Sequence, residues 1–506
     1  MNFGLLVRTI IHLRPQQIIY QLWKKAYIPK YRAFESPSLV ERHFAIKTEP
    51  IPKFKSVEEN IFTFLNLEHE YAGWSFTDNG MLWAYNQNYF DWINQEGFSE
   101  EDGCKWIDKF IEELPENKVG LDPYPIALRS INWVKFFCRY PQSATKSRLD
   151  SLYSQIKLLE KKLEYHLLGN HLLEDAYALY ICACYFDDKQ LLKKASLLLK
   201  EQLKEQILLD GAHYEQSPMY HCILLDRLLD CINFAYGLRL TADGNKESRI
   251  QEFENFLISY AERMLGHLES IVWKDKTIPL LNDSAFGIAP TSESLFDYAK
   301  RLGLSWKKIP MKECGYRKLQ NGHFEAILDV GNITASYQPG HSHADTLNYV
   351  LRVDGKPIVI DTGVSTYNAT NRRQYERSTI AHNCVSVGGK DSSEVWGGFR
   401  VGKRCEVRVT TDSDHEISAE HNGFGKTCVR DYQLGENSFT ITDVVDGEAI
   451  SYIHLAPGIS PDRVKVVGAD KVEVIDDKVS VEYNQFIDIK VLKICFSNTC
   501  KYIIEI

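Results

Sequence analysis

The sequence lacks the features that would place it in several specialised classes of protein. Its 59 Lys and Arg residues are outnumbered by 68 Asp and Glu residues, for a formal net charge of −9, and no basic stripe suggests a nucleic-acid ligand. Internal repeats and low-complexity tracts are also missing. The twelve Cys residues include no CxxC pair. Most lie in apolar runs such as "YICACYF", which favours reduced core thiols over a disulfide framework.

The N-terminus lacks the signature of export or membrane insertion. The run "MNFGLLVRTIIHLRPQQIIYQLW" is interrupted by Arg8 and has no small-residue cleavage pattern. A signal peptide needs such a pattern, and a membrane helix needs about 20 apolar residues in a row. We therefore expect no signal peptide and no membrane span. This predicts a cytoplasmic location, with the periplasm as the alternative.

Apolar residues at helical spacing dominate the chain from about residue 60 to 300. The clearest case is "QEFENFLISYAERMLGHLES", where apolar side chains recur three and four positions apart. They are Phe253, Phe256, Leu257, Tyr260, Ala261, Met264, Leu265 and Leu268. Similar runs follow one another across polar loops, which predicts an all-helical domain built from antiparallel hairpins.

The pattern changes to short alternating runs after about residue 312. Examples are "CEVRVTT", "KVEVIDDKVSVEY" and "IDIKVLKICF", separated by turns that contain Gly, Asp or Asn. Alternation of this kind is typical of antiparallel strands with one buried face. The sequence thus predicts a multidomain α+β protein. It has an N-terminal appendage (1–55), a helical domain (56–311) and an antiparallel β-sandwich (312–506).

Two aromatic stretches combine flat rings with amide and guanidinium groups. They are "LWAYNQNYFDWI" (82–93) and "LRSINWVKFF" (128–137). Sugars stack their C–H faces on rings and use directed hydrogen bonds for their hydroxyls, so these stretches are candidate glycan-binding surfaces. An aromatic helix face in the core explains the spacing equally well. The candidate residues are Trp83, Asn86, Tyr89, Arg129, Asn132 and Trp133.

Polar residues also gather in two helix-forming stretches. In "LLGNHLLEDAYALY" they are Asn170 and His171, where Asn170 is alternatively a cap for the start of the next helix. In "DGAHYEQSPMYHCILL" two Tyr, two His and one Glu precede or enter a helix that begins near Pro218. Such a group favours the edge of a cleft. Its members are His213, Tyr214, Glu215, Tyr220 and His221.

The densest cluster of ligating groups lies in the predicted sandwich. "PGHSHADTLNY" contains His341, His343 and Asp345, "IVIDTG" contains Asp361, and "RSTIAHNCVSVGG" adds three polar residues. Those three are Arg377, His382 and Asn383. Imidazoles and carboxylates from separate strands either form a metal site or pair with one another as a buried network. Spacing alone leaves both possibilities open.

Taken in order, these segments resemble the heparinase II/III-like family of polysaccharide lyases. The resemblance includes "GNHLLEDAYAL", "LNDSAFG" and "RSTIAHNCVSVGGKDSSEVWGGFRVGKR", and it spans about residues 80 to 404. It implies an incomplete (α/α) toroid followed by an antiparallel β-sandwich, with the active site in the cleft between them. It also implies cleavage of uronic-acid polysaccharides by β-elimination.

The resemblance also implies roles for individual residues. Asn170 would neutralise the substrate carboxylate. Tyr220 would be the base, the acid or both, and His341 would be the partner base or acid. Tyr214 is a rival to Tyr220. A substrate-binding role extends to Trp83, Asn86, Tyr89, Arg129, Asn132, Trp133, His171, Tyr214, Glu215 and Arg377.

A structural metal site is implied as well. It would consist of His343, Asp361 and His382, and zinc is the ion that two imidazoles and one carboxylate favour. A shift of two positions would exchange the roles of His341 and His343.

Two other functions are compatible with the residues. A glycoside hydrolase would need two carboxylates across the cleft, for which Glu215 and Asp283 are candidates. A non-catalytic glycan-binding or assembly protein would keep the aromatic cleft without the proton-transfer geometry. The segment "RTIIHLRPQQIIYQLW" also resembles the leader of family members associated with bacterial capsule or surface polysaccharide. The expected partner is thus an acidic polysaccharide, and the oligomeric state stays open.

Overall fold

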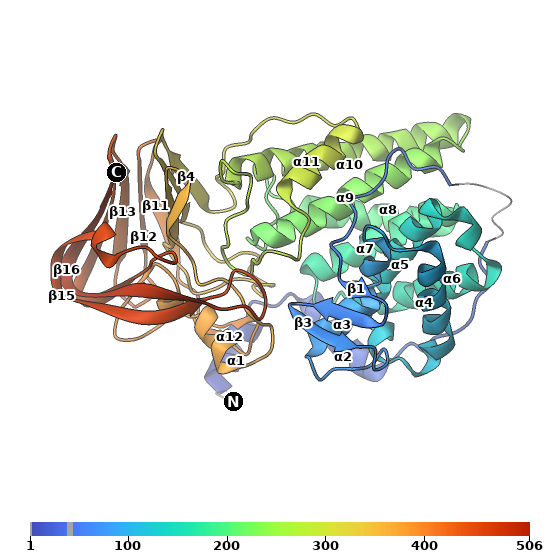
Figure 1. Cartoon of the computed structure of the whole chain (residues 1–506), viewed down its shortest axis with the longest axis horizontal. Coiled ribbons are helices and arrows are strands. Elements are labelled where there is room, and N and C mark those ends of the chain that lie inside the picture. The colour runs from blue at the N-terminus through green and yellow to red at the C-terminus, as the bar shows by residue number, and fades with distance from the viewer. Residues whose placement is uncertain (1–2, 38–43) are drawn as a thin grey trace.

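The computed structural model describes residues 3–37 and 44–506. Figure 1 shows a helical domain beside a domain of β-sheets, with the chain passing from the first to the second once. The last helix of the helical domain, α11, ends at Arg301, and the first strand of the sheet domain, β4, begins at Tyr316. The protein has a multidomain α+β fold, as the sequence predicts.

Nine helices of the described chain build the helical domain. They are α3 (Met81–Tyr89), α4 (Glu100–Glu113), α5 (Pro123–Arg139), α6 (Lys146–Lys162), α7 (Gly169–Phe186), α8 (Lys189–Gln206), α9 (Pro218–Arg239), α10 (Gly244–Ile271) and α11 (Ser292–Arg301). Only His171 of α7 escapes full burial. A helix that is apolar on all sides belongs in the interior, so the run "ALYICACYF" accounts for the central place of α7.

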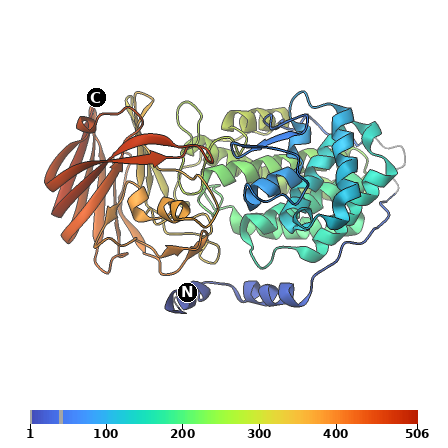
Figure 2. The same ribbon diagram turned by 60° about the horizontal axis from the view of Figure 1, so that its bottom comes forward.

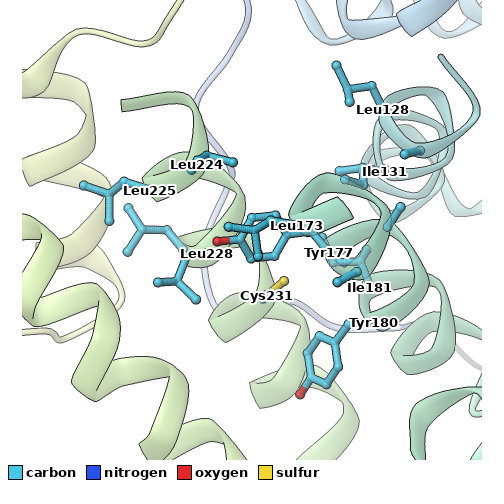
Figure 3. Packing of buried hydrophobic residues seen from close by; sticks show 14 of the residues in the cluster. Leu128, Ile131, Leu173, Tyr177, Tyr180, Ile181, Leu224, Leu225, Leu228 and Cys231 are labelled. Carbon is cyan, nitrogen blue, oxygen red and sulfur yellow. The ribbon is translucent and has the colours of Figure 1, made fainter. Parts of the chain in front are cut away.

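The core of the helical domain lies where α5, α7 and α9 meet. Figure 3 shows side chains of these three helices packed together. They include Leu128, Ile131, Leu173, Tyr177, Tyr180, Ile181, Leu224, Leu225, Leu228 and Cys231. Deleting a large side chain from such a core typically costs about 2–5 kcal/mol, because the cavity left behind is only partly refilled. This packing keeps rigid the first turns of the helices that contribute to the candidate active site.

A small sheet interrupts the predicted helical region. It contains β1 (Val57–Glu58), β2 (Ile61–Phe64) and β3 (Leu67–Glu70) in the order β1-β2-β3. Phe62 and Phe64 alternate with exposed neighbours along β2, and Asn66 turns the chain at a positive φ of 60°. Period-two alternation and a turn residue are strand signals. The expectation of helices from about residue 60 was therefore wrong for this stretch.

The sheet domain is a sandwich of two antiparallel sheets. The larger has the order β11-β12-β13-β14-β16-β15, with β8 paired to β14, and the smaller has the order β4-β5-β6-β7. Their side chains share one core, in which Phe324 of β5 faces Phe439 of β14. The bounds in the smaller sheet are β4 (Tyr316–Gln320), β5 (Phe324–Asp329), β6 (Tyr349–Val353) and β7 (Lys356–Val359).

The larger sheet contains the long strands that the alternating runs predict. Its bounds are β8 (Val385–Ser386), β11 (Val407–Asp412), β12 (Glu416–His421), β13 (Cys428–Leu434), β14 (Ser438–His454), β15 (Lys465–Val479) and β16 (Ile487–Glu505). A separate ribbon pairs β9 (Val395–Trp396) with β10 (Arg400–Val401), and helix α12 (Asn371–Glu376) precedes β8. The long loops before β6 and between β7 and β8 face the helical domain and carry the polar clusters.

The first two helices lie along one edge of the molecule. Figure 2 shows α1 (Phe3–Ile10) and α2 (Pro15–Ala26) in blue, α1 beneath the sheet domain and α2 beneath the helical domain. Arg8 pairs with Glu394 of the sheet domain at 2.7 Å, while Tyr20 stacks against Tyr165 of the helical domain. No helix in the described part of the chain is long and apolar enough to cross a membrane.

Candidate active site

A cavity of about 900 Å³ lies where the two domains meet. Its walls come from α1 and α2, from the helix starts of the helical domain, and from loops of the sandwich. Polar residues that line it include Asn86, Tyr89, Asn170, His171, Tyr220, His341, Tyr367 and Arg404. A cavity of this size with a few converging polar groups is typical of a ligand site.

The first turn of α7 presents Asn170 to this cavity. Leu168 and Gly169 both adopt positive φ values, 64° and 61°. A Cβ on Gly169 would lie 2.3 Å from Glu215 Oε1, so only glycine allows this close approach. Asn170 is the second residue of α7 and its side chain does not cap the helix. The alternative that Asn170 is an N-cap was therefore wrong.

Glu215 holds the Asn170 amide in place. The backbone N–H of Asn170 donates to Glu215 Oε1 at 2.8 Å, and Asn170 Nδ2 donates to Glu215 Oε2 at 2.9 Å. The same Nδ2 lies 3.3 Å from His341 Nε2. All three residues are buried, so the amide from one domain and the imidazole from the other are held in contact in a water-poor site.

Asp283 orients the imidazole of His341. His341 Nδ1 lies 2.9 Å from Asp283 Oδ2, and Arg373 of α12 donates to both oxygens of the same carboxylate at 2.5 and 2.7 Å. Although burial opposes its charge, Arg373 and the two imidazoles beside it hold the pKa of Asp283 well below its usual range. Asp283 thereby fixes the ring of His341, whose Nε2 lies 3.3 Å from Asn170 Nδ2 and 3.5 Å from Glu215 Oε2 at the cavity.

Tyr220 lies against the same imidazole. Its ring stacks on His341 with centroids 3.9 Å apart, and the Tyr367 hydroxyl lies 3.4 Å from the Tyr220 hydroxyl. Burial raises the pKa of Tyr220 above its ordinary value, although Tyr367 partly opposes the shift. The phenol is therefore protonated at neutral pH. The site thus places a protonated phenol and an amide donor in contact with the same imidazole.

The structure places six of the predicted site residues at the cavity. They are Asn86, Tyr89, Asn170, His171, Tyr220 and His341. His171 has an additional partner, since its Nδ1 lies 2.9 Å from Glu164 Oε2. Burial opposes the charge of this imidazole, but Glu164 outweighs it and raises the pKa of His171. His171 therefore adds positive charge to the cavity wall at mildly acidic pH.

Four predicted substrate ligands lie in the core instead. Trp83 and Trp133 are fully buried; Trp83 Nε1 donates to the Leu67 carbonyl, and the Trp133 ring packs against Phe110. The other two have main-chain partners. Arg129 donates to the Asn88 and Gly120 carbonyls and to Gln155, and Asn132 donates to the Tyr89 carbonyl. The prediction that these four bind substrate was wrong: none lines the cavity, the polar groups of Trp83, Arg129 and Asn132 hold the main chain behind it, and Trp133 fills the core.

Three further candidates act from behind the cavity wall. Glu215 holds Asn170, as described above. The buried Tyr214 hydroxyl accepts a hydrogen bond from Tyr337 at 3.1 Å. Arg377 is fully buried and donates to the Ser342 carbonyl at 2.8 Å, which fixes the loop that carries His341. None of the three lines the cavity in the described structure, so Tyr214 and Arg377 serve the architecture of the site.

The predicted metal ligands form two separate hydrogen-bonded pairs beside His341. His343 Nε2 lies 2.8 Å from Asp283 Oδ1, and His382 Nδ1 lies 2.8 Å from Asp361 Oδ2. The two imidazole rings are 5.2 Å apart. Their other nitrogens, His343 Nδ1 and His382 Nε2, are buried without a hydrogen-bond partner. These two donors suit zinc, but Asp361 is occupied by His382, Asn348 and Gly363.

A different trio brings ligand-type atoms closer together. Within residues 3–37 and 44–506, one set of at least three His, Cys, Asp or Glu residues has its ligand atoms within 4.8 Å of one another: Asp210, His267 and Cys314. Asp210 Oδ2 accepts hydrogen bonds from the backbone N–H groups of Lys312 and Cys314. Asp210 thereby anchors the segment that joins the two domains, which gives this trio a structural role.

Several members of the site are not predicted from the sequence. Asp283 is predicted only as a hydrolase carboxylate, and Arg373, Tyr367 and Arg404 are not predicted at all. Arg404 Nε and Nη1 are buried at the cavity without a hydrogen-bond partner. Asp283 and Arg373 lie 90 positions apart, so no local spacing could pair them. The stretch "FRVGKR" did carry a usable signal, because it places three cationic residues within five positions.

The chain belongs to the heparinase II/III-like family. The family model described as "Heparinase II/III N-terminus" matches residues 132–300. The model described as "Heparinase II/III-like, C-terminal" matches residues 305–487. Together they cover most of the chain and divide it where the helices give way to strands.

Two curated relatives are described as heparin-sulfate lyases. The one from Bacteroides stercoris is 21% identical over 262 residues, covering 45% of this chain and 37% of the relative. The one from Pedobacter heparinus is 23% identical over 339 residues, covering 60% of this chain and 47% of the relative. The chain therefore matches less than half of the length of either relative.

Solved structures share the fold. A crystal structure of heparinase III superposes with a TM-score of 0.63 at 15% identity, covering 86% of this chain and 79% of that chain. Heparan sulfate lyase HepC from Pedobacter heparinus has a TM-score of 0.53 at 14% identity, covering 97% and 88%. At this level of identity the likeness concerns architecture alone.

Proposed function

We propose that this protein is a polysaccharide lyase that cleaves a uronic-acid-containing glycan by β-elimination. One observation carries the proposal: two groups contact the imidazole of His341. Asn170 Nδ2 lies 3.3 Å from His341 Nε2, and the centroid of the Tyr220 ring lies 3.9 Å from that of the imidazole. These are the three groups that elimination beside a carboxylate requires. They come from two domains that a common cavity joins.

Asn170 would bind the carboxylate on C5 of the uronate. As the C5 proton leaves, negative charge spreads onto this carboxylate, and a fixed N–H donor stabilises it more than it stabilises the ground state. Glu215 is the positioning residue, since it holds the amide through two hydrogen bonds. Because Glu215 already orients the amide, the substrate carboxylate would only have to replace His341 Nε2 as the partner of its second N–H.

His341 and Tyr220 would carry the proton transfers. His341 Nε2 takes the C5 proton, the C5–H electrons form the C4=C5 double bond, and the C4–O4 bond breaks. The Tyr220 hydroxyl gives its proton to the departing O4, and the proton on His341 then restores the phenol. Their stacking allows this last step within the site, and a general acid and base typically contribute about 10²- to 10⁴-fold each.

The charge around the cavity supports an acidic substrate. The chain carries a net charge of −9, yet the described cavity wall has five Lys or Arg residues (Lys25, Lys53, Arg227, Arg400 and Arg404) against one carboxylate, Asp91. Lys53 pairs with Asp91 and Arg227 with Asp226, which leaves Lys25, Arg400 and Arg404 for a ligand. Arg404 has two buried N–H groups without partners. A buried donor without a partner is costly, so a carboxylate or sulfate group of the substrate is the natural acceptor.

The geometry disfavours glycoside hydrolysis. That reaction needs one carboxylic acid and one carboxylate facing the sugar from opposite sides. Glu215 is engaged by Asn170, and Asp283 by Arg373, His341 and His343. Neither residue lines the cavity.

A panel of soluble uronic polymers tests the proposal. The purified chain is incubated with each polymer, and the ultraviolet absorbance of the conjugated unsaturated uronate is recorded. Only elimination creates this chromophore, whereas hydrolysis releases reducing ends without it. Binding of a polymer with no new chromophore, under conditions in which the cavity is occupied, would favour the glycan-binding alternative.

The biological setting forms a further part of the proposal. Because the N-terminus resembles the leader of capsule-associated family members, we propose that the substrate is the cell's own surface polysaccharide and that the protein acts in the cytoplasm. Fractionation of the native host with an antibody against the chain would test the location. Recovery in a periplasmic extract would support the alternative.

A structural zinc ion at His343, Asp361 and His382 is also proposed. The two unpartnered imidazole nitrogens support it, while Asp361 would have to release a hydrogen bond to become a ligand. No catalytic step depends on the ion. Elemental analysis of the dialysed protein should find about one zinc per chain, and His343→Ala should lose it. A metal-free native protein that folds normally would disprove the site.

A further inference from the structure

The N-terminal strap, defined here as residues 3–34, has two different faces. Its inner face holds the two domains together: Gln17 Nε2 donates to the Leu167 carbonyl of the helical domain and to the Tyr337 carbonyl of the sandwich, each at 3.2 Å. Arg14 forms an ion pair with Glu205. The inner face also contributes Leu6, His12, Gln17, Gln21 and Lys25 to the cavity wall.

The outer face of the strap is apolar and exposed. The side chains of Ile19, Leu22 and Trp23 on α2 are 62%, 64% and 57% exposed, and Ile28 after the helix is 74% exposed. Further exposed large apolar residues of the strap are Phe3, Val7, Ile11, Ile18, Tyr20, Tyr27 and Phe34. So many exposed apolar side chains on one short segment are costly in water and mark a docking site.

The strap is also uniformly basic. It contains Arg8, Arg14, Lys24, Lys25, Lys30 and Arg32 and no Asp or Glu, although the whole chain has a net charge of −9. Arg8 and Arg14 are paired with Glu394 and Glu205, which leaves the four exposed cations Lys24, Lys25, Lys30 and Arg32 for an occupant. Trp and Tyr rings beside lysines are the composition that favours the boundary between lipid headgroups and acyl chains. Its occupant should therefore be both apolar and anionic.

We propose that the strap docks the protein on the surface of an anionic lipid bilayer. Its aliphatic and aromatic side chains would enter the headgroup region, and its cations would meet anionic headgroups. The two helices lie along a single edge of the molecule (Figure 2), as a planar surface requires. A second copy of the chain fits less well, because two straps packed together would set four exposed cations against four. A glycan offers no acyl region for the aliphatic side chains.

Docking would bring the cavity close to the bilayer. The strap lies between the cavity, which its inner face lines, and the solvent, to which its outer face is exposed. A glycan that is anchored in the same bilayer would then meet the cavity at short range. The inference is independent of the lyase activity, since no residue of the outer face belongs to the proposed catalytic group.

Vesicle flotation with the full-length chain tests the inference. We expect the chain to float with vesicles of phosphatidylcholine and phosphatidylglycerol, to stay behind with phosphatidylcholine alone, and to bind less as salt rises. The variant Ile19→Glu/Trp23→Glu should lower the bound fraction by about tenfold or more, because it places two carboxylates in the apolar face. The matched control is Leu197→Glu/Leu240→Glu, at sites 56% and 55% exposed in the helical domain; it should bind like the native chain.

Several results would overturn the inference. If the native chain does not float with the anionic vesicles at low salt, the strap does not dock on a bilayer and the inference is refuted. Equal flotation of the Ile19→Glu/Trp23→Glu variant would also refute it. Light scattering that shows a dimer abolished by this variant, without vesicle binding, would identify a second copy as the occupant. Turnover of a soluble oligosaccharide should be unchanged in the variant, which separates this test from that of the lyase activity.

Discussion

The imidazole of His341 stacks on the phenol ring of Tyr220, with centroids 3.9 Å apart and planes inclined by 28°. His341 lies in the loop between β5 and β6, and Tyr220 lies in the first turn of α9. The contact therefore forms only when the two domains are assembled. Because Asp283 holds His341 from the other side, neither ring can shift without disturbing the arrangement that the proposed proton transfers need.

Tyr220→Phe should abolish most of the elimination activity. The substitution keeps the stacked ring and removes only the hydroxyl, so we expect turnover to fall by about 10²- to 10⁴-fold while KM stays nearly constant. Initial rates of chromophore formation give both quantities. Tyr214→Phe is the matched control, because its hydroxyl bonds Tyr337 behind the cavity, and it should keep near-native turnover. If Tyr220→Phe is fully active and Tyr214→Phe is not, the two roles must be exchanged.

Asn170→Ala should lower turnover by about 10²- to 10³-fold, because the charge that develops on the substrate carboxylate loses its donor. Asn86→Ala is a suitable control: Asn86 also lines the cavity, but its Nδ2 donates to the Leu82 carbonyl of its own helix. It should affect turnover far less. Circular dichroism would confirm that both variants are folded. Equal losses in the two variants would remove the special role of Asn170.

Arg404→Gln should weaken substrate binding more than it slows chemistry. The guanidinium has two buried N–H groups at the cavity but no contact with His341 or Tyr220 in the described structure. We expect KM to rise by about tenfold, equivalent to about 1.4 kcal/mol, with turnover nearly unchanged. Arg408→Gln, at an exposed ion pair with Glu420, should change neither. A normal KM for Arg404→Gln would remove it from the substrate site.

Glu174→Gln should stabilise the protein at alkaline pH. Both carboxylate oxygens of Glu174 are buried without hydrogen bonds, and burial raises its pKa from 4.5 to about 7, although Arg227 partly opposes the shift. Between these two values the folded state keeps a proton that the unfolded state has released. The free energy of unfolding therefore falls as pH rises from 4.5 to about 7.

Glu174→Gln cannot titrate, so its free energy of unfolding should not fall over this pH range. Above pH 7 its free energy of unfolding should exceed that of the native chain by up to about 3 kcal/mol, since each pKa unit corresponds to about 1.4 kcal/mol. Below pH 4.5 the two should be alike. Urea unfolding at both ends of this range measures the difference, and Glu201→Gln on the exposed side of α8 is the control. A pH-independent difference would show that Glu174 does not titrate as described.

The two aromatic stretches show what helical periodicity cannot predict. Trp83, Asn86, Tyr89 and Trp133 share similar surroundings in the sequence, yet Asn86 and Tyr89 face the cavity while the two Trp rings fill the core. Helical periodicity identifies the inward side of a helix. It cannot say whether that side meets other side chains or a hollow, because this depends on how neighbouring helices are placed.

The sequence by itself determined the class of fold and the order of its parts. Apolar spacing of three and four positions specifies helices, alternation specifies strands, and the change between them falls where the structure changes. The family resemblance of the ordered motifs pointed to Asn170, Tyr220 and His341. Only the tertiary structure decided which groups support them: Glu215, Asp283 and Arg373 reach the site from separate segments. Long-range packing of two domains sets those contacts, and no local pattern encodes them.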